Sequence, residues 1–223
     1  MTDYFLEIQI DQAGLQTIAN SGMSVALLQP QQNATYQIVA VLTSATGTMQ
    51  IRWTDDEFVY ASAYGLSAYS VPQINSSNSA LSGQVFTYNG SLITQTGSTS
   101  MAKTIQVSNG SGSSATCGLA RVFTVNGQAQ SLAITCAASL LANGLGSFEI
   151  SNQILLTLLG NAQLGMALPS DAIPNFKVSR MRKRSMAVVT VQPPLILDFD
   201  ASHAAQNVHF DDQNGSFVAG PLP

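Results

Sequence analysis

The richest concentration of side chains that can bind a ligand lies between residues 53 and 69. Five of the sixteen aromatic residues fall there, namely Trp53, Phe58, Tyr60, Tyr64 and Tyr69. Tryptophan and tyrosine carry an apolar face and a polar edge, which suits stacking on sugar rings, enclosing a choline headgroup or lying at a membrane interface. Aromatic residues are also favoured in strands, and core packing is the alternative for Trp53 and Phe58. We predict a ligand-binding set of Trp53, Tyr60, Tyr64 and Tyr69.

A second cluster lies between residues 198 and 212, which hold both histidines and four of the twelve acids. An antiparallel hairpin that pairs Phe199 with Phe210 sets carboxylates and an imidazole on one polar face. The weak metal candidates on that face are Asp198, Asp200, His209 and Asp211. Such a face can bind a divalent cation or transfer a proton. The chain has no HExxH, no calcium-loop pattern, no nucleophile elbow and no phosphate loop. A solvated strand face is therefore the main expectation, and we assign no catalytic residue and no cofactor.

Basic residues are concentrated in one run, because five of the eight lie between positions 177 and 184. They are Lys177, Arg180, Arg182, Lys183 and Arg184. One interpretation is an edge strand protected by charge against aggregation. A second is attraction to anionic lipid headgroups or another polyanion. A third is proteolytic processing after the dibasic pair. We assign the run to an anionic-surface site.

A turn predicts where the two cysteines lie. Asn126-Gly127 is typical of a two-residue hairpin loop, and in that register Cys117 lies directly opposite Cys136. In this register Leu119 and Ile134 lie on the same face as the cysteines, which indicates that this face belongs to the core. A disulfide fits this spacing, whereas two reduced buried thiols fit a reducing compartment. Both states stay open.

The elements that must position these residues are strands. Five Asn-Gly dipeptides indicate many hairpins, since both residue types tolerate the positive φ of tight turns. They lie at 89–90, 109–110, 126–127, 143–144 and 214–215. Apolar and polar residues alternate at 6–11 and 49–54, as in half-buried antiparallel strands. Residues 149–168 fit a helix or strands, and their glycines favour strands. We predict one all-β domain over residues 1–223, an antiparallel β-sandwich with little helix, with a β-barrel or a trefoil-like fold as the alternative.

Composition and charge limit the partners and the compartment that we expect for this protein. Charged residues make up 9% of the chain, against roughly 25% in ordinary soluble domains. The net charge of −4 argues against a nucleic-acid partner. The start of the chain has no signal-peptide pattern, so we expect a protein that is cytoplasmic as synthesised or released without a classical signal.

The leading hypothesis is a non-enzymatic recognition protein of lectin or toxin type. It would bind a glycan or lipid headgroup, at a membrane surface in one version, through exposed tyrosines and amide-rich loops. A structural, self-assembling β protein is the first alternative, and a homo-oligomer is expected. A metal-dependent hydrolase centred on the C-terminal Asp/His hairpin is the second alternative. The blend of aromatics, low charge and a basic run is similar in composition to pore-forming sandwich toxins, a likeness that transfers no site.

Overall fold

The computed structural model describes residues 2–31, 35–42, 45–169, 172–173 and 193–223. Over these ranges the chain is mostly β, with 53% strand and one short helix. The strands form four sheets, none of which closes on itself within the described residues. Among the described strands, neighbours are antiparallel except in two pairs. The predicted all-β class with little helix is therefore confirmed.

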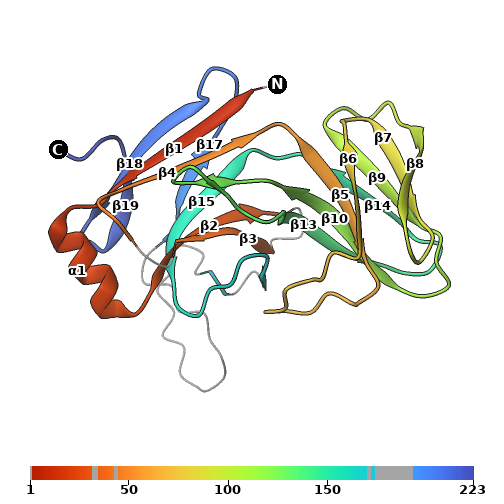
Figure 1. Ribbon diagram of the computed structural model, residues 1–223, viewed down its shortest axis with the longest axis horizontal. Coiled ribbons are helices and arrows are strands. Elements are labelled where there is room, and N and C mark those ends of the chain that lie inside the picture. The colour runs from red at the N-terminus through yellow and green to blue at the C-terminus, as the bar shows by residue number, and fades with distance from the viewer. Residues whose placement is uncertain (1, 32–34, 43–44, 170–171, 174–192) are drawn as a thin grey trace.

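Two of the sheets contain the strands from both ends of the chain and lie at the left and centre of Figure 1. Sheet A has the order β12-β11-β4-β1-β18-β19 and comprises β1 (Asp3–Gln9), β4 (Thr48–Thr54), β11 (Thr124–Val125), β12 (Gln128–Ala129), β18 (Ala205–Asp211) and β19 (Ser216–Ala219). Sheet B has the order β16-β3-β2-β15-β17 and comprises β2 (Ser24–Pro30), β3 (Tyr36–Leu42), β15 (Gln153–Leu159), β16 (Ala167–Leu168) and β17 (Leu195–Asp198). Strands β1 and β18 are parallel, although they are separated by most of the chain.

The other two sheets come from the middle of the chain. Sheet C has the order β13-β10-β5-β6 and comprises β5 (Glu57–Ser62), β6 (Ser76–Ala80), β10 (Ala115–Arg121) and β13 (Ala133–Leu140). Sheet D has the order β14-β9-β7-β8 and comprises β7 (Gln84–Tyr88), β8 (Ile93–Ser98), β9 (Thr104–Asn109) and β14 (Leu145–Glu149). It lies at the right of Figure 1, far from the helix at the left. Strands β7 and β9 are parallel, so both end at the same edge.

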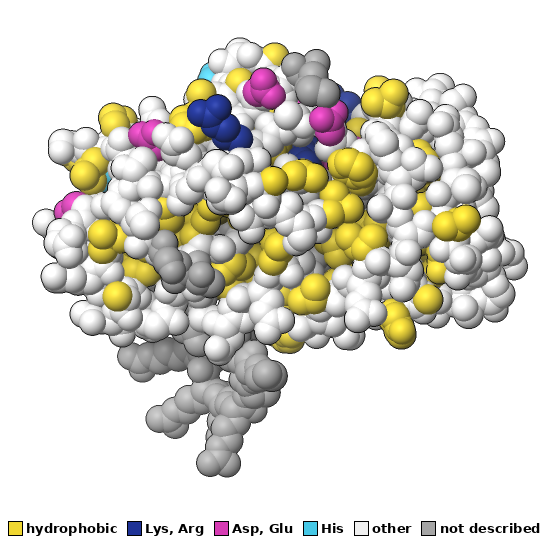
Figure 2. Space-filling model, viewed as in Figure 1, with side chains coloured by type: hydrophobic (Ala, Val, Ile, Leu, Met, Phe, Trp, Pro, Cys, Tyr) yellow, Lys and Arg dark blue, Asp and Glu magenta, His cyan; other side chains and the backbone are white. Residues whose placement is uncertain are grey.

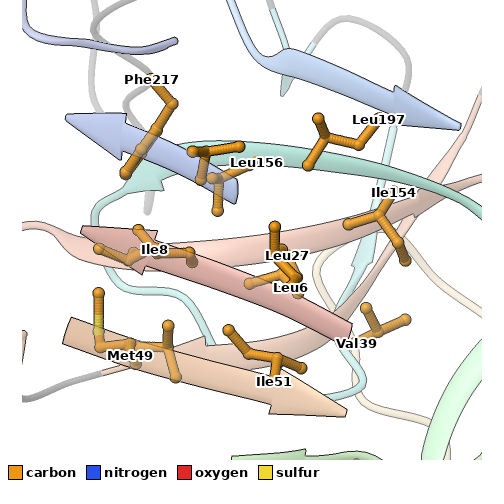
Figure 3. Packing of buried hydrophobic residues seen from close by; sticks show 14 of the residues in the cluster. Leu6, Ile8, Leu27, Val39, Met49, Ile51, Ile154, Leu156, Leu197 and Phe217 are labelled. Atoms are coloured by element: carbon orange, nitrogen blue, oxygen red, sulfur yellow. The ribbon is translucent and has the colours of Figure 1, made fainter. Parts of the chain in front are cut away.

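Hydrophobic alternation explains the main core. In β1 the side chains of Tyr4, Leu6 and Ile8 are buried, while the residues between them are partly exposed. One cluster joins this face of sheet A to residues of sheet B such as Leu27 and Leu156, which lie close to Leu6 and Ile8 in Figure 3. A second cluster joins the facing residues of sheets C and D. The first cluster also includes Ile18 of the helix and Ala133 of β13 in sheet C.

The single described helix, α1 (Gln12–Ser21), joins β1 to β2. Asp11 caps its start by accepting a hydrogen bond from the Gly14 amide at 2.7 Å. Gly22 ends it in the left-handed conformation, at φ 67°. No helix among the described residues is long and apolar enough to span a membrane.

The predicted cysteine register is wrong. Cys117 pairs with Ala138, and Cys136 pairs with Leu119. A register shift between Leu119 and Ala120 accounts for part of the difference. The Asn126-Gly127 turn closes the short hairpin β11–β12, which joins sheet A beside β4, so it does not set the pairing of β10 with β13. Both thiols are free, and burial raises the pKa of each to about 12. The cysteine face does line the core between sheets C and D.

Strands replace the helix considered for residues 149–168. Strand β15 is buried along nearly its whole length, between β2 and β17 in sheet B. A strand covered on both faces needs apolar side chains at consecutive positions, which is the pattern that also resembles a helix. The prediction of strands is confirmed here.

Candidate functional site

Three loops meet at one end of sheets C and D, and we call this region the loop end. They are residues 89–92 between β7 and β8, 110–114 between β9 and β10, and 141–144 between β13 and β14. Strand pairing brings them together, because Tyr88 lies beside Asn109 and the next strand of sheet D begins at Leu145, beside the end of β9. Three of the five Asn-Gly dipeptides lie at this end.

Asn109 holds two of these loops in place. Its side chain is fully buried, and its Nδ2 lies 2.8 Å from the Ser113 carbonyl oxygen, 3.1 Å from that of Leu140 and 3.0 Å from that of Leu141. Its Oδ1 accepts hydrogen bonds from the amide and hydroxyl of Ser111, at 3.1 and 2.6 Å. Buried amides that bind several backbone groups rigidify a loop. The loop end is therefore pre-ordered.

The third loop is fixed in the same way. The Oδ1 of Asn89 accepts hydrogen bonds from the amides of Ser91 and Leu92, at 3.0 and 2.8 Å. The Tyr88 hydroxyl donates to the Gly90 carbonyl at 2.8 Å. The side chains of Asn89 and Asn109 thus form hydrogen bonds with the loop backbone, which reduces the cost of removing that backbone from water.

Large apolar side chains project from this ordered scaffold. Leu92, Leu141 and Leu145 are 58%, 77% and 62% exposed. Residues 89–92, 110–114 and 141–145 include no charged residue. In Figure 2 the right-hand part of the visible face, where sheet D lies, shows no acidic or basic side chain. The loop end is thus apolar at its tips and uncharged around them.

The four predicted aromatic residues do not lie together in the structure, since two are exposed and two are buried. Tyr64 is 62% exposed, and its carbonyl accepts a hydrogen bond from the Thr116 hydroxyl at 2.7 Å, near the loop end. Tyr69 is also exposed, but its amide donates to the Ala167 carbonyl of sheet B at 2.7 Å, so it lies elsewhere. Trp53 and Tyr60 are buried, so neither ring can stack on a ligand from solvent in this structure.

Strand position explains the burial of these two rings. Trp53 alternates with Met49 and Ile51 on the face of β4 that packs toward sheet B, and its ring lies 4.7 Å from that of Phe199. Tyr60 lies between two neighbouring strands of sheet C and is fully buried, which raises the pKa of its hydroxyl. Core packing, the alternative considered for Trp53, is what the structure shows.

The predicted C-terminal hairpin is wrong. Strand β17 pairs with β15 in sheet B, whereas β18 lies between β1 and β19 in sheet A. Phe210 pairs with Phe217 instead of Phe199. In place of the predicted hairpin, β18 forms a parallel pair with β1, from the other end of the chain. A local sequence pattern does not reveal such a pairing.

The four acidic and histidine candidates consequently have separate local roles. Asp198 accepts a hydrogen bond from Gln153 at 2.7 Å, and Asp211 accepts one from Asn214 at 2.6 Å. Hydrogen bonds from the Ser202 hydroxyl and neighbouring backbone amides lower the pKa of Asp200 to about 2. His209 Nδ1 lies 3.1 Å from the Gly220 carbonyl oxygen. Over the described part of the chain, no group of three or more His, Cys, Asp or Glu residues could hold a metal ion.

The basic run from Lys177 to Arg184 lies outside the described residues. The leucines of the loop end are the feature that sequence reasoning missed. Two of the Asn-Gly turns are flanked by leucine, as in Leu141-Ala142-Asn143-Gly144-Leu145, which was the available signal. No protein-family model, curated protein or solved structure matches this chain.

Proposed function

We propose that this protein is a non-enzymatic recognition protein that binds a lipid surface through the loop end. The observation that carries the proposal is the projection of three exposed leucines from adjacent, uncharged loops. Tyr64, which is exposed and whose carbonyl is bonded to Thr116 near the loop end, suits the interfacial layer of a membrane, where an apolar ring and a polar hydroxyl are both accommodated.

The energetics favour reversible attachment. Full burial of a leucine side chain contributes about 1.5–3 kcal/mol, so three leucines contribute up to roughly 5–9 kcal/mol before the cost of association. The loops are already ordered by Asn89 and Asn109, so little further entropy is lost on binding. No charged side chain of the three loops has to be desolvated.

Lipid suits this surface better than a glycan or a protein. The buried amide of Asn109 and the Oδ1 of Asn89 are engaged with the loop backbone, so they are not available to bind sugar hydroxyls. Protein-binding hot spots are enriched in Trp, Tyr and Arg, whereas these loops consist of Leu, Ser, Gly, Asn and Ala.

Co-sedimentation with vesicles of neutral phosphatidylcholine tests the proposal. The double variant Leu141→Ser/Leu145→Ser should bind at least about tenfold more weakly, since each lost leucine removes more than 1.4 kcal/mol on full burial. The control is Leu81→Ser/Met101→Ser, because these side chains are 67% and 49% exposed at the opposite end of sheets C and D. Equal binding by both variants, or no binding of the unmodified protein, would contradict the proposal.

The salt dependence of vesicle binding distinguishes attachment through the loop end from attachment through the basic run. Binding through uncharged loops should persist when ionic strength rises from about 0.01 M to about 1 M, a range over which the Debye length falls from about 30 Å to about 3 Å. Binding that requires anionic lipid and is lost in salt would assign membrane attachment to residues 177–184 instead.

We infer that the sheets form the predicted sandwich arrangement, in which sheets A and B are one pair of layers and sheets C and D are another. The division of the two largest hydrophobic clusters between these two pairs of sheets supports this arrangement.

A further inference from the structure

A cleft of about 440 Å³ lies where sheets B, C and D approach one another. The end of β2, the start of β5, the free edge of β13 and the end of β14 form its walls. Leu145 begins β14 and Glu149 ends it, so the cleft lies at the far end of that strand from the loop end. The two sites are separate, so ligand binding in the cleft does not require lipid binding at the loop end.

Three polar side chains of the cleft each keep one atom without a hydrogen-bond partner. Gln29 is 4% exposed and Glu57 is 2% exposed. The unpartnered atoms are Gln29 Oε1, Glu57 Oε2 and Gln31 Nε2. Buried polar atoms are nearly always paired, so unpartnered atoms on side chains that line one cleft indicate a place for a polar ligand.

The second polar atom of each glutamine fixes its orientation. Gln29 Nε2 donates to the Ser151 carbonyl at 2.6 Å. Gln31 Oε1 accepts a hydrogen bond from the Ala137 amide at 3.3 Å. The first amide is thereby left with a free acceptor and the second with a free donor.

Arg121 fixes Glu57. This arginine is fully buried and is ion-paired to Glu57 Oε1 through Nη2, while its Nη1 donates to Asn152 Oδ1 at 2.8 Å. Asn152 in turn donates to the Tyr4 hydroxyl at 2.9 Å. The ion pair compensates the charge of Glu57 and leaves Oε2 as an acceptor.

We propose that this cleft binds a neutral, polyhydroxylated small molecule of the saccharide class. Each sugar hydroxyl is both donor and acceptor, so adjacent hydroxyls match two acceptors and one donor. Phe148 and Phe199 also line the cleft but are only 3% and 6% exposed, so recognition rests on the hydroxyl groups of the ligand. Because Arg121 is ion-paired to Glu57, the other charged groups that line the cleft are the carboxylates of Glu149 and Asp198 and the ammonium of Lys103. This excess of negative charge disfavours anionic ligands.

The test is an NMR titration of the full chain with a panel of neutral mono- and disaccharides, with choline, inorganic phosphate and Ca²⁺ as further probes. A saccharide should shift the amide signals of Ala137 and Ser151. Gln31→Glu keeps the acceptor oxygen but replaces the free donor, and should weaken binding by at least about tenfold. Gln95→Glu adds the same charge on an exposed position of β8 and should leave binding unchanged.

Two controls distinguish a loss of saccharide binding from unfolding and from a loss of vesicle binding. Gln31→Glu puts a carboxylate oxygen in place of the buried Nε2 and should lower the melting temperature, so binding is compared at a temperature at which circular dichroism shows both variants folded. Leu141→Ser/Leu145→Ser should retain saccharide binding, whatever its effect on vesicles. The proposal is overturned if no saccharide shifts these signals, if choline, phosphate or Ca²⁺ shifts them in place of sugars, or if Gln31→Glu binds sugar as well as Gln95→Glu does.

Discussion

The buried ion pair between Glu57 and Arg121 gives the most quantitative prediction. Both side chains are almost inaccessible to water, at 2% and 1% exposure. Removing one partner leaves an uncompensated buried charge, which costs about 3–5 kcal/mol, whereas replacing both partners with apolar residues of similar volume is often nearly neutral. We therefore expect Glu57→Met and Arg121→Met each to lower the free energy of unfolding by about 3–5 kcal/mol, and the double variant to lower it by less than about 2 kcal/mol.

Urea denaturation followed by circular dichroism measures the free energy of unfolding of the unmodified protein, the two single variants and the double variant. The pH dependence of these values identifies which buried charge lowers stability. Burial raises the pKa of Glu57 above its ordinary value of 4.5, although Arg121 partly opposes the shift. A raised pKa in the folded state means that stability is greatest below the ordinary value and falls as pH rises through the folded-state pKa. The deficit of Arg121→Met should shrink as pH is lowered toward 4.5, whereas that of Glu57→Met should not. Additive losses in the double variant, or equal pH dependence of the two single variants, would refute the reasoning.

Three further predictions concern the strand register, the thiols and the loop end. A Cβ on Gly118 would lie 1.9 Å from the Cys136 carbonyl oxygen, so Gly118→Ala should cost more than about 3 kcal/mol in urea denaturation. Gly112→Ala, with nothing within 4 Å of its Cβ, should stay within about 0.5 kcal/mol, and equal effects would contradict the register. The pKa of Cys117 is raised from 9.0 to about 12 and Cys117 is fully buried, so the neutral thiol stabilises the fold below pH 9.0 and stability falls up to about pH 12. Cys117→Ala should flatten that alkaline decline by about 1.4 kcal/mol per pH unit, and an unchanged slope would exclude the thiol as its source. Asn109→Ala removes several buried hydrogen bonds and should cost roughly 2–4 kcal/mol, with faster amide hydrogen exchange in residues 110–114 and 141–144; unchanged exchange would mean that Asn109 does not order these loops.

Local patterns were sufficient to predict much of the fold. Alternation in β1 and β4 identified two half-buried strands, because side chains on a strand point to opposite faces in turn. The Asn-Gly dipeptides marked real connections between strands, and three of them close antiparallel hairpins, at 89–90, 126–127 and 214–215. The other two lie between strands of different sheets.

What escaped prediction depends on contacts between distant residues. The register of β10 against β13 shifts after Leu119, and the parallel pairing of β1 with β18 joins opposite ends of the chain. Neither is encoded in a single turn or in a periodic stretch.

The candidate sites were harder to predict for the same reason. The loop end combines three loops that are separated by up to about fifty residues, and the cleft combines Gln29, Glu57 and the edge of β13. Exposed tyrosines were expected as the binding residues, but Tyr60 completes a core strand, while Tyr64 and Tyr69 lie against different sheets.

The most direct test of lipid recognition places an environment-sensitive fluorophore on the loop end. Leu141→Cys can be labelled selectively, because the pKa of both native thiols is about 12 and thiolates are the reactive form. On adding phosphatidylcholine vesicles, the emission of the label at position 141 should shift to the blue and gain intensity, while a label at Leu81→Cys should not respond. Equal responses at the two positions, or no response at 141 under conditions in which the protein sediments with vesicles, would contradict the claim that the loop end enters the lipid surface.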